Sequence, residues 1–369
     1  MEEPIRILHI LQRMEAAGIQ SFLMNLYRCI DRSRIQFDFL VQYKADEFYD
    51  KEIKDMGGRI YKFSVREDYN LIRYRKEIRT FFEQHKEYKI IHGHMETLSN
   101  IWESEAARAN VRTIICHSHT AGFNEKNPIK LIIKQLYRHY YGTHADLLFA
   151  CSNAAGNFMF PGRKYQLIPN AINVEKYKYS EAGRDLRKEL GINECFVIGH
   201  VGRFHPSKNH AFILEVMQQL SDLVPNAKAL LIGDGDIREQ ISEDIRKKNI
   251  EDKVLMLGNR QDVNLLYSAM DAFIMPSYFE GLPLVGVEAQ SSGLPCIFSE
   301  NITNELQITD LATFLPIDGN SPKLWADQLA EISNLKIDRR KYAAIVGENG
   351  YDIKTLSEIL TQKYEGLYR

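Results

Sequence analysis

The chain has 369 residues, 44% of them hydrophobic and 26% charged, and its formal net charge at pH 7 is −2. This length predicts two domains of ordinary size, and the composition excludes wholesale disorder. The near-neutral charge gives no electrostatic support for nucleic-acid binding. Five cysteines without a C-x-x-C pair favour a reduced, cytoplasmic protein over a disulfide framework.

The N-terminus, Met1-Glu2-Glu3-Pro4, lacks the basic and apolar regions of a signal peptide. No apolar run reaches the roughly 20 residues that a membrane-spanning helix needs. We therefore expect any work at a membrane to be peripheral, on the inner face of the cell membrane.

In the first half of the chain, short β-branched apolar runs alternate with segments of helical periodicity. Strands are expected over Ile5–Leu11, Phe37–Val41, Lys89–His92, Thr113–Cys116 and Leu147–Cys151. Helices are expected over Ile19–Ile30, Leu71–His85, Ser99–Ala109 and Ile129–Tyr141. This alternation predicts parallel strands joined by crossover helices, in a three-layer α/β domain.

Two histidine pairs, His92 with His94 and His117 with His119, lie at predicted strand ends. Residues two apart on a strand share a face, so each pair could converge on a metal ion. Alternate side chains at strand ends can also simply line a cleft. No carboxylate–histidine ligand motif accompanies these pairs, so we favour cleft lining and expect no metal.

Asn127 and Pro128 predict the start of a helix that carries one basic stripe. The stripe consists of Lys126, Lys130, Lys134 and Arg138, four residues apart, and an apolar sector lies beside it. A helix of this kind over 126–141 could lie on an anionic membrane. It could also pack on the sheet with its charges solvated, which is the prediction we favour. The basic, aromatic stretch Tyr69–Phe82 leaves the same choice open.

The alternating pattern restarts after the connector Ile168–Ile172, so we place the domain boundary near Asn170. Strands are expected over Phe196–Val201, Ala227–Ile232, Val254–Leu257, Ala272–Met275 and Pro295–Phe298. Helices are expected over Asn209–Leu220, Ile237–Lys248, Asn264–Ala269 and Leu284–Ser292. The sequence thus predicts two Rossmann-like α/β domains, 1–170 and 171–352, that face each other across a cleft. The amphipathic helix of segment 353–369 is expected to pack back on the first domain.

Two glutamates follow the predicted strand Ala272–Met275. Glu280 ends a loop, and Pro283 fits the first turn of a helix whose free amides and partial positive charge suit a phosphate. Glu288 lies inside that helix among apolar residues, where a carboxylate needs a partner. A ribose diol would serve, but on these residues alone an ordinary ion pair is the favoured interpretation.

Arg203 and Lys208 flank a turn after the predicted strand Phe196–Val201. A departing nucleoside diphosphate develops negative charge, which preorganised cations stabilise. Two solvated surface cations are the plainer interpretation of the pair.

The stretch Met275–Gln290 resembles the signature of family 4 of the retaining glycosyltransferases, which have the GT-B architecture. That signature is two glutamates separated by seven residues, with Gly-Leu-Pro after the first. Segment Gly202–Asn209 resembles the family's Gly-Arg-x-x-x-x-Lys-Gly segment, with Asn209 in place of the last glycine. Leu231–Gly235 resembles its strand-ending Gly-x-Gly turn, and Leu257–Arg260 stands where family members contact the nucleotide base. The chain looks closest to bacterial members that build capsular, exo- or lipopolysaccharide chains.

The resemblance implies roles for individual residues. Glu280 would lie near the anomeric centre of the donor sugar, and Arg203 and Lys208 would hold its diphosphate. His117, with His119 as the second choice, would contact the primary hydroxyl region of that sugar. The implied donor-binding set is Gly18, Gly233, Asp234, Arg260, Gly281, Leu282, Pro283, Leu284 and Glu288.

The implied reaction moves a hexosyl or N-acetylhexosaminyl group from a nucleotide diphosphate sugar to a hydroxyl of a glycan or lipid-linked acceptor. The resemblance implies retention of configuration, without a covalent nucleophile or a metal cofactor, and a UDP-linked donor on frequency alone. Two alternatives stay open. One is a nucleotide-sugar epimerase of the same architecture, and the other is a non-catalytic partner subunit that has kept the fold.

Overall fold

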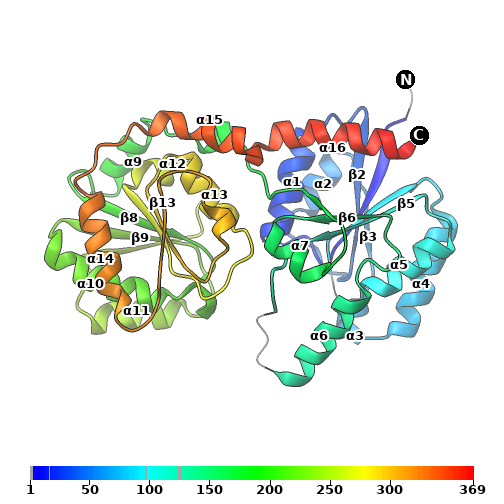
Figure 1. Ribbon diagram of the computed structural model, residues 1–369, viewed down its shortest axis with the longest axis horizontal. Helices are drawn as coiled ribbons and strands as arrows, with labels where there is room; N and C mark the ends of the chain where they lie inside the picture. The colour runs from blue at the N-terminus through cyan, green and yellow to red at the C-terminus, as the bar shows by residue number, and fades with distance from the viewer. Residues whose placement is uncertain (1–2, 16, 96–97, 124–126) are drawn as a thin grey trace. The chain divides into compact units, whose positions relative to one another are not determined.

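The computed structural model describes residues 3–15, 17–95, 98–123 and 127–369. The chain divides into two compact units: Met1–Asn170 with Ile353–Arg369, hereafter the N-terminal unit, and Ala171–Asp352, the C-terminal unit. Each is built on one sheet with helices on both faces (Figure 1). None of the described helices combines the length and hydropathy needed to cross a bilayer.

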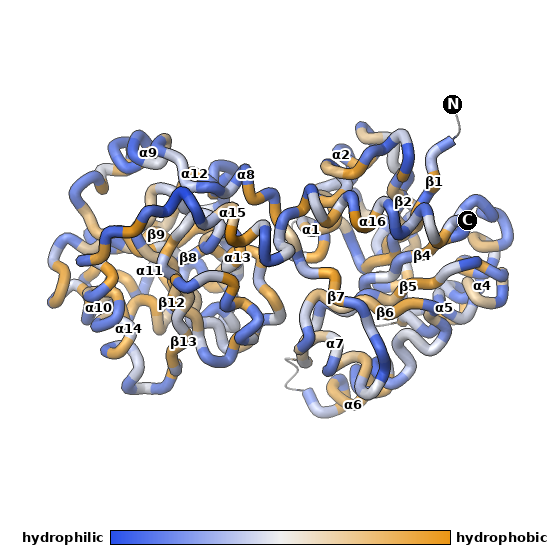
Figure 2. The backbone as a smooth tube through the Cα atoms, turned by 45° about the horizontal axis from the view of Figure 1, so that its top comes forward, coloured by the Kyte–Doolittle hydropathy of each residue, from blue (hydrophilic) through white to orange (hydrophobic). Residues whose placement is uncertain are grey.

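The N-terminal unit contains a parallel sheet of order β3-β2-β1-β4-β5-β6-β7. Its strands are β1 Ile5–Ile10, β2 Ile35–Val41, β3 Ile60–Lys62, β4 Ile90–Gly93, β5 Thr113–Ser118, β6 Leu147–Ala150 and β7 Gln166–Leu167. Its helices are α1 Gly18–Cys29, α2 Asp50–Asp55, α3 Val65–Asp68, α4 Leu71–Gln84, α5 Ser99–Arg108, α6 Pro128–Tyr140, α7 Asn153–Met159 and α16 Ile353–Tyr368. The strands β4, β5 and β6 are largely hydrophobic (Figure 2), as expected of strands covered on both faces.

Helices from distant parts of the chain cover the two faces of this sheet. On one face, Tyr74 of α4 and Trp102 of α5 join the apolar cluster of the strands. On the other face, the rings of Tyr27 from α1 and Tyr364 from α16 both contact Phe37 of β2. The last helix of the chain therefore belongs to the core of the N-terminal unit.

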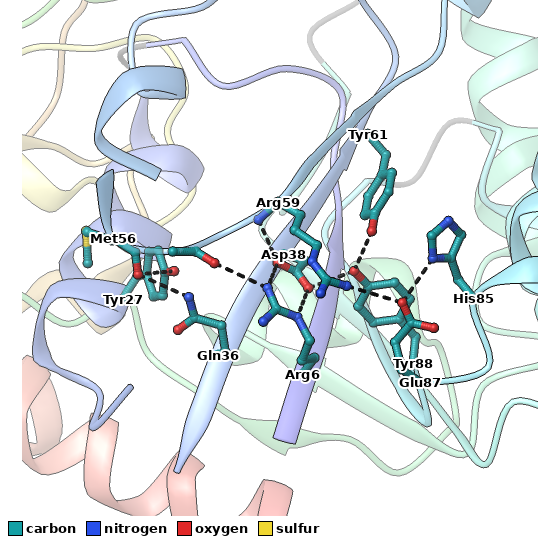
Figure 3. A network of polar contacts seen from close by, with 11 residues as sticks. Arg6, Tyr27, Gln36, Asp38, Met56, Arg59, Tyr61, His85, Glu87 and Tyr88 are labelled. Atoms are coloured by element: carbon teal, nitrogen blue, oxygen red, sulfur yellow. Dashed lines mark hydrogen bonds and ion pairs between the residues drawn. The ribbon is translucent and has the colours of Figure 1, made fainter. Parts of the chain in front are cut away.

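A buried ion pair joins β1 and β2 near the amino ends of the strands (Figure 3). The Arg6 guanidinium donates two hydrogen bonds of 2.6 Å to the Asp38 carboxylate, which is fully buried. The Tyr88 hydroxyl and the Arg59 backbone amide donate to the same carboxylate, at 2.7 and 2.6 Å. Four donors thus compensate the burial of one carboxylate, which gives this end of the sheet a structural role.

The C-terminal unit contains a parallel sheet of order β10-β9-β8-β11-β12-β13. Its strands are β8 Phe196–Val201, β9 Ala227–Ile232, β10 Val254–Gly258, β11 Ala272–Met275, β12 Cys296–Ser299 and β13 Ala312–Leu315. Its helices are α8 Val174–Tyr177, α9 Gly183–Glu189, α10 His210–Leu223, α11 Arg238–Lys247, α12 Val263–Ala269, α13 Leu284–Ser291, α14 Ser321–Ile332 and α15 Tyr342–Val346. One apolar cluster includes Tyr267 of α12 and Val287 of α13, and a second includes Met217 of α10 and Trp325 of α14.

All the strands and helices expected from the sequence are present, with ends shifted by a few residues. Strands β3, β7 and β13 were not predicted, because they are only 3, 2 and 4 residues long. Seven of the described helices were not predicted either: α2, α3, α7, α8, α9, α14 and α15. One packing prediction is wrong: none of the 13 residues of α6 is buried, so its apolar sector does not pack on the sheet. Lys126, the first cation of the predicted stripe, lies outside the described residues.

Candidate active site

The two strands at the centre of the C-terminal sheet are β8 and β11, where the strand order reverses. Ligands of open α/β sheets bind outside the carboxyl ends of the strands at such a switch point, because the loops there diverge. The loop after β8 carries Arg203 and Lys208, and the loop after β11 carries Glu280. The topology therefore brings the predicted basic and acidic motifs to one place.

Lys208 and Glu280 form an ion pair in which the Lys208 ammonium donates to Glu280 Oε1. Both side chains are largely withdrawn from solvent, with 19% and 15% exposed. The two loops are also joined through the backbone, since the Tyr278 amide donates to the Ser207 carbonyl at 2.9 Å. The pair places a partly desolvated cation and anion beyond the carboxyl ends of the two central strands.

Asn209 adopts a left-handed backbone conformation, with φ of 58°, between the 3-10 turn Pro206–Lys208 and α10. Asparagine tolerates this conformation better than other non-glycine residues. The departure from the family's glycine therefore keeps the backbone turn that follows Lys208.

Gly233 at the end of β9 has a φ of 133°, and a Cβ there would lie 2.0 Å from the Gly202 carbonyl oxygen. Only glycine lets these two loops approach so closely. The Phe204 amide donates to the Asp234 carbonyl at 2.9 Å, and the Asp234 side chain accepts from the Gly235 amide at 2.8 Å. Gly233 and Asp234 thus shape the loop after β8 from the neighbouring strand.

Glu288 lies in α13 and is buried. Its Oε2 accepts a hydrogen bond from the Tyr267 hydroxyl of α12 at 3.0 Å. Burial raises the pKa of Glu288, while hydrogen bonds from Tyr177 and Tyr267 lower it in part. Within the part of the chain described, Glu288 forms no ion pair and its hydrogen-bond partners are tyrosine hydroxyls, so the alternative interpretation as an ordinary ion pair is not supported.

The remaining residues predicted to bind the donor, together with Arg203, lie in both units of the chain. Leu282 is buried, Pro283 caps α13, and Leu284 is its first residue; Gly281 directly follows Glu280. Arg203 pairs with Asp236 at 3.1 Å, and Arg260 pairs with Asp262 at 2.6 Å. Gly18 begins α1 in the other unit, and a Cβ there would meet nothing within 4 Å. No packing constraint therefore requires glycine at position 18.

The predicted histidine pairs meet in the N-terminal unit, together with His9 of β1. His9 Nδ1 lies 3.0 Å from His94 Nε2, and His94 Nδ1 lies 3.0 Å from His119 Nε2. His92 bridges the Tyr364 hydroxyl, at 2.7 Å, and His117 Nδ1, at 3.3 Å. His117, the predicted sugar contact, is fully buried, whereas His119 is partly exposed.

These five imidazoles are neutral at physiological pH. Burial lowers the pKa of His9 to about 3 and that of His119 to about 4, and the pKa values of His92, His94 and His117 also fall well below normal. Two triplets, His9/His92/His94 and His94/His117/His119, have ring nitrogens within 4.8 Å of one another. The spacing suits a metal ion as well as hydrogen bonds, but no carboxylate belongs to either triplet.

Participants that were not predicted from the sequence include His9, Tyr267 and Tyr364. His9 is one of two polar residues, with Arg6, in an otherwise apolar strand, and its register opposite His92 could not be predicted from the sequence. The two tyrosines lie in helices whose apolar periodicity gave no reason to separate them from the core.

Sequence models of two families match the chain and define its class. The model of the glycosyl transferases group 1 matches residues 184–352, which belong to the C-terminal unit. The model of glycosyltransferase family 4 matches residues 16–176. With two parallel Rossmann-like sheets, these matches define a glycosyltransferase of the GT-B fold.

Individual relatives support this class over nearly the whole chain. Glycosyltransferase EpsF of Bacillus subtilis is 33% identical, over 94% of this chain and 93% of its own length. The UDP-Gal:α-D-GlcNAc-diphosphoundecaprenol α-1,3-galactosyltransferase of Escherichia coli is 24% identical, over 90% of this chain and 89% of its own. The crystal structure of Anabaena HepE in complex with UDP has a TM-score of 0.77, at 20% identity, covering 98% of this chain and 100% of that one. The chain belongs to glycosyltransferase family 4.

Proposed function

We propose that this glycosyltransferase moves a hexosyl or N-acetylhexosaminyl group from a UDP-sugar to a hydroxyl of a lipid-linked saccharide or glycan during polysaccharide biosynthesis, with retention of configuration. One observation carries the proposal: the contact between Lys208 and Glu280 at the switch point of the C-terminal sheet. A cation and an anion at that point match the two charges that a sugar diphosphate develops as its glycosidic bond breaks.

The charge distribution supports this assignment of roles. The leaving diphosphate gains negative charge, and we assign its stabilisation to Lys208 and Arg203 on the loop after β8. The anomeric carbon gains positive charge, which the Glu280 carboxylate stabilises. The amides of 281, 282 and 284 precede or open α13, where a phosphate gains from the helix dipole.

Glu288 is assigned to the nucleotide ribose. Its carboxylate accepts from Tyr267 and retains acceptor capacity for a ribose hydroxyl, because a carboxylate offers about four lone-pair sites. A uridine nucleotide is supported by the solved relative in complex with UDP and by the UDP-dependent name of the Escherichia coli relative.

The acceptor is proposed to be lipid-linked, and the enzyme to work at the inner face of the cell membrane. The Escherichia coli relative is named for a diphosphoundecaprenol acceptor. Helix α6 offers a membrane contact, since its apolar residues Ile129 and Ile132 are exposed and its cations suit an anionic surface. Sedimentation with phosphatidylglycerol vesicles, lost in Ile132→Asp, tests this contact.

No covalent nucleophile and no metal ion are assigned. The departing phosphate is proposed to take the proton of the acceptor hydroxyl on the same face of the sugar. A dication among the buried histidines would lack a compensating carboxylate, which makes its burial costly. Transfer should therefore be unchanged after dialysis against EDTA, and activity restored only by added metal would contradict this assignment.

Saturation-transfer NMR against a panel of nucleotide sugars tests donor binding, and product NMR tests the anomeric configuration. The proposal expects binding of a UDP-sugar and an α-linked product from an α-linked donor. A new sugar nucleotide formed without acceptor would identify an epimerase instead. Full activity of an assembled complex that contains Glu280→Ala would identify a non-catalytic subunit.

A further inference from the structure

Two sequence segments with similar character, Tyr69–Phe82 and α6, meet in the N-terminal unit. Between them lies a pocket of about 350 Å³. It is lined by Arg66, Tyr69, Leu71, Leu98, Lys130, Ile133, Lys134 and Tyr137. Helices α3 and α6 lie next to each other (Figure 1), although more than fifty residues separate them in the chain. Both segments thus contribute to one surface.

The pocket lies at the border between the two faces of α6. At about 100° per residue, Ile129, Ile132 and Leu136 point to one side, and the basic stripe points to another. Ile133 and Tyr137 stand at the edge of the apolar side, next to Lys130 and Lys134. A ligand in this pocket would meet an apolar wall and a cationic wall at once.

The charges of the pocket lining have one sign. Among the residues that the structure describes, Arg66, Lys130 and Lys134 line it and no carboxylate does. Arg66 Nε donates a hydrogen bond of 2.8 Å to Gln42 Oε1, and Lys134 Nζ lies 5.8 Å from the centre of the Phe123 ring. Lys130 makes no ion pair with any residue that the structure describes. Three cations around a small apolar pocket favour a ligand with more than one negative charge.

The apolar residues here are unusually exposed. Ile72 is 86% exposed and Ile129 is 68% exposed, and Tyr69, Ile132, Leu136 and Tyr140 are each at least half exposed. Exposed apolar side chains that gather beside cations favour a binding site for a lipid or a partner. Because cations adjoin these apolar side chains, a lipid that carries negative charge is the favoured ligand.

We propose that the pocket between α3, α4 and α6 binds an isoprenoid diphosphate, with the chain against Leu71, Ile133 and Tyr137 and the diphosphate on Lys130, Lys134 and Arg66. This inference rests on the lipid-linked acceptor of the proposed function and identifies the part of the enzyme that holds its carrier. A diphosphate matches three cations better than the single charge of a phospholipid headgroup does.

Calorimetric titration of the full chain with farnesyl diphosphate, without any bilayer, tests the proposal. Inorganic diphosphate lacks the isoprenoid chain, and farnesol lacks the diphosphate. Each should bind at least about tenfold more weakly than farnesyl diphosphate, because it contacts only the cationic or only the apolar residues of the pocket. Soluble dihexanoyl phosphatidylglycerol should also bind about tenfold more weakly. Equal binding of that lipid would overturn the proposal in favour of a general phospholipid surface.

Matched variants locate the site. Ile133→Asp and Lys130→Glu should each weaken farnesyl diphosphate binding by about tenfold. Their controls are Ile359→Asp, a residue of α16 that is 48% exposed against 45% for Ile133, and Lys86→Glu, an exposed cation of the same unit. Equal loss in a control, or no loss in the pocket variants, would overturn the assignment.

UDP-sugar binding by the same variants separates this proposal from the proposed function. Donor binding should be unchanged in Ile133→Asp and Lys130→Glu, which also shows that both variants are folded. Donor binding without farnesyl diphosphate binding would reject the pocket alone. A wild-type chain that binds no UDP-sugar would reject the proposed function, whatever the lipid result.

Discussion

The carboxyl ends of the two sheets carry opposite kinds of chemistry. In the C-terminal unit, the switch strands β8 and β11 lead to the charged pair of Lys208 and Glu280. In the N-terminal unit, the switch strands β1 and β4 carry histidines that burial keeps neutral. The same topology therefore presents charges in one unit and uncharged hydrogen-bonding rings in the other. We infer that the first suits a diphosphate and the second suits sugar hydroxyls.

The largest effect is expected from removing the charge of Glu280. Glu280→Gln keeps the shape of the side chain but loses the anion that we propose to lie opposite the developing positive charge. We expect kcat to fall by roughly a hundredfold to a thousandfold, the range for one preorganised electrostatic group. Initial rates with saturating donor and acceptor measure this loss. The control is Glu251→Gln, an exposed glutamate of the same unit. A Glu280→Gln enzyme with more than half the wild-type kcat would remove the charged pair from the chemistry.

The amino ends of the strands provide the contrasting case, where charge serves stability. Asp38→Asn leaves Arg6 largely buried without its anion, and Tyr88 and the Arg59 amide with a weaker acceptor. We expect the free energy of unfolding to fall by about 3 kcal/mol, at the lower end for a broken buried pair because Arg6 is partly exposed. Urea denaturation measures it. The specific activity of the folded fraction should stay unchanged, and a selective loss of activity would show that this pair also serves the site.

The sequence allowed the fold and the charged half of the site to be predicted. Apolar alternation marked the strands, and the motifs around Lys208 and Glu280 each followed a strand, so parallel topology alone brought them together. The partners of buried groups could not be predicted in this way. Tyr267 contacts Glu288 only because α12 and α13 pack together, and that packing is not encoded in either helix alone.

The surface of α6 shows a second limit of the sequence. Its periodicity predicted an apolar face, but periodicity does not say whether another element covers that face. The structure leaves Ile129 and Ile132 exposed and adds Leu71 from a segment far away in the chain.

The neutral histidines of the N-terminal unit predict a sensitivity to acid. The pKa of His9 is lowered to about 3 in the folded chain, so the unfolded chain, with an ordinary value near 6.5, binds the extra proton first. Stability is therefore full above about pH 6.5 and falls as the pH drops toward 3. At pH 5 the loss from His9 alone is about 2 kcal/mol relative to pH 7.

Urea denaturation of wild type and His9→Gln at pH 7 and pH 5 measures this contribution. The variant should lose about 2 kcal/mol less than wild type between the two pH values, because it no longer takes up that proton. His139→Gln, a variant of an exposed histidine, should lose as much as wild type. An equal pH response of His9→Gln and wild type would mean that His9 is accessible to protons in the folded chain.

The smallest expected effect concerns Tyr267 and sharpens the role of Glu288. In Tyr267→Phe the ring still fills its place in the core, but the hydroxyl that donates to Glu288 is lost. Burial already raises the pKa of Glu288, and loss of the donor should raise it further. If Glu288 binds the ribose as a carboxylate, we expect the KM for the donor to rise about five- to tenfold, equivalent to about 1 kcal/mol for one hydrogen bond, with kcat nearly unchanged. The rise should be larger at pH 5 than at pH 8, because protonation removes the acceptor.

The control for this prediction is Tyr74→Phe, which breaks the hydrogen bond from Gln42 in the other unit and should leave the KM unchanged. A fall in kcat without a change in KM would place Tyr267 and Glu288 in the chemical step instead of in donor binding.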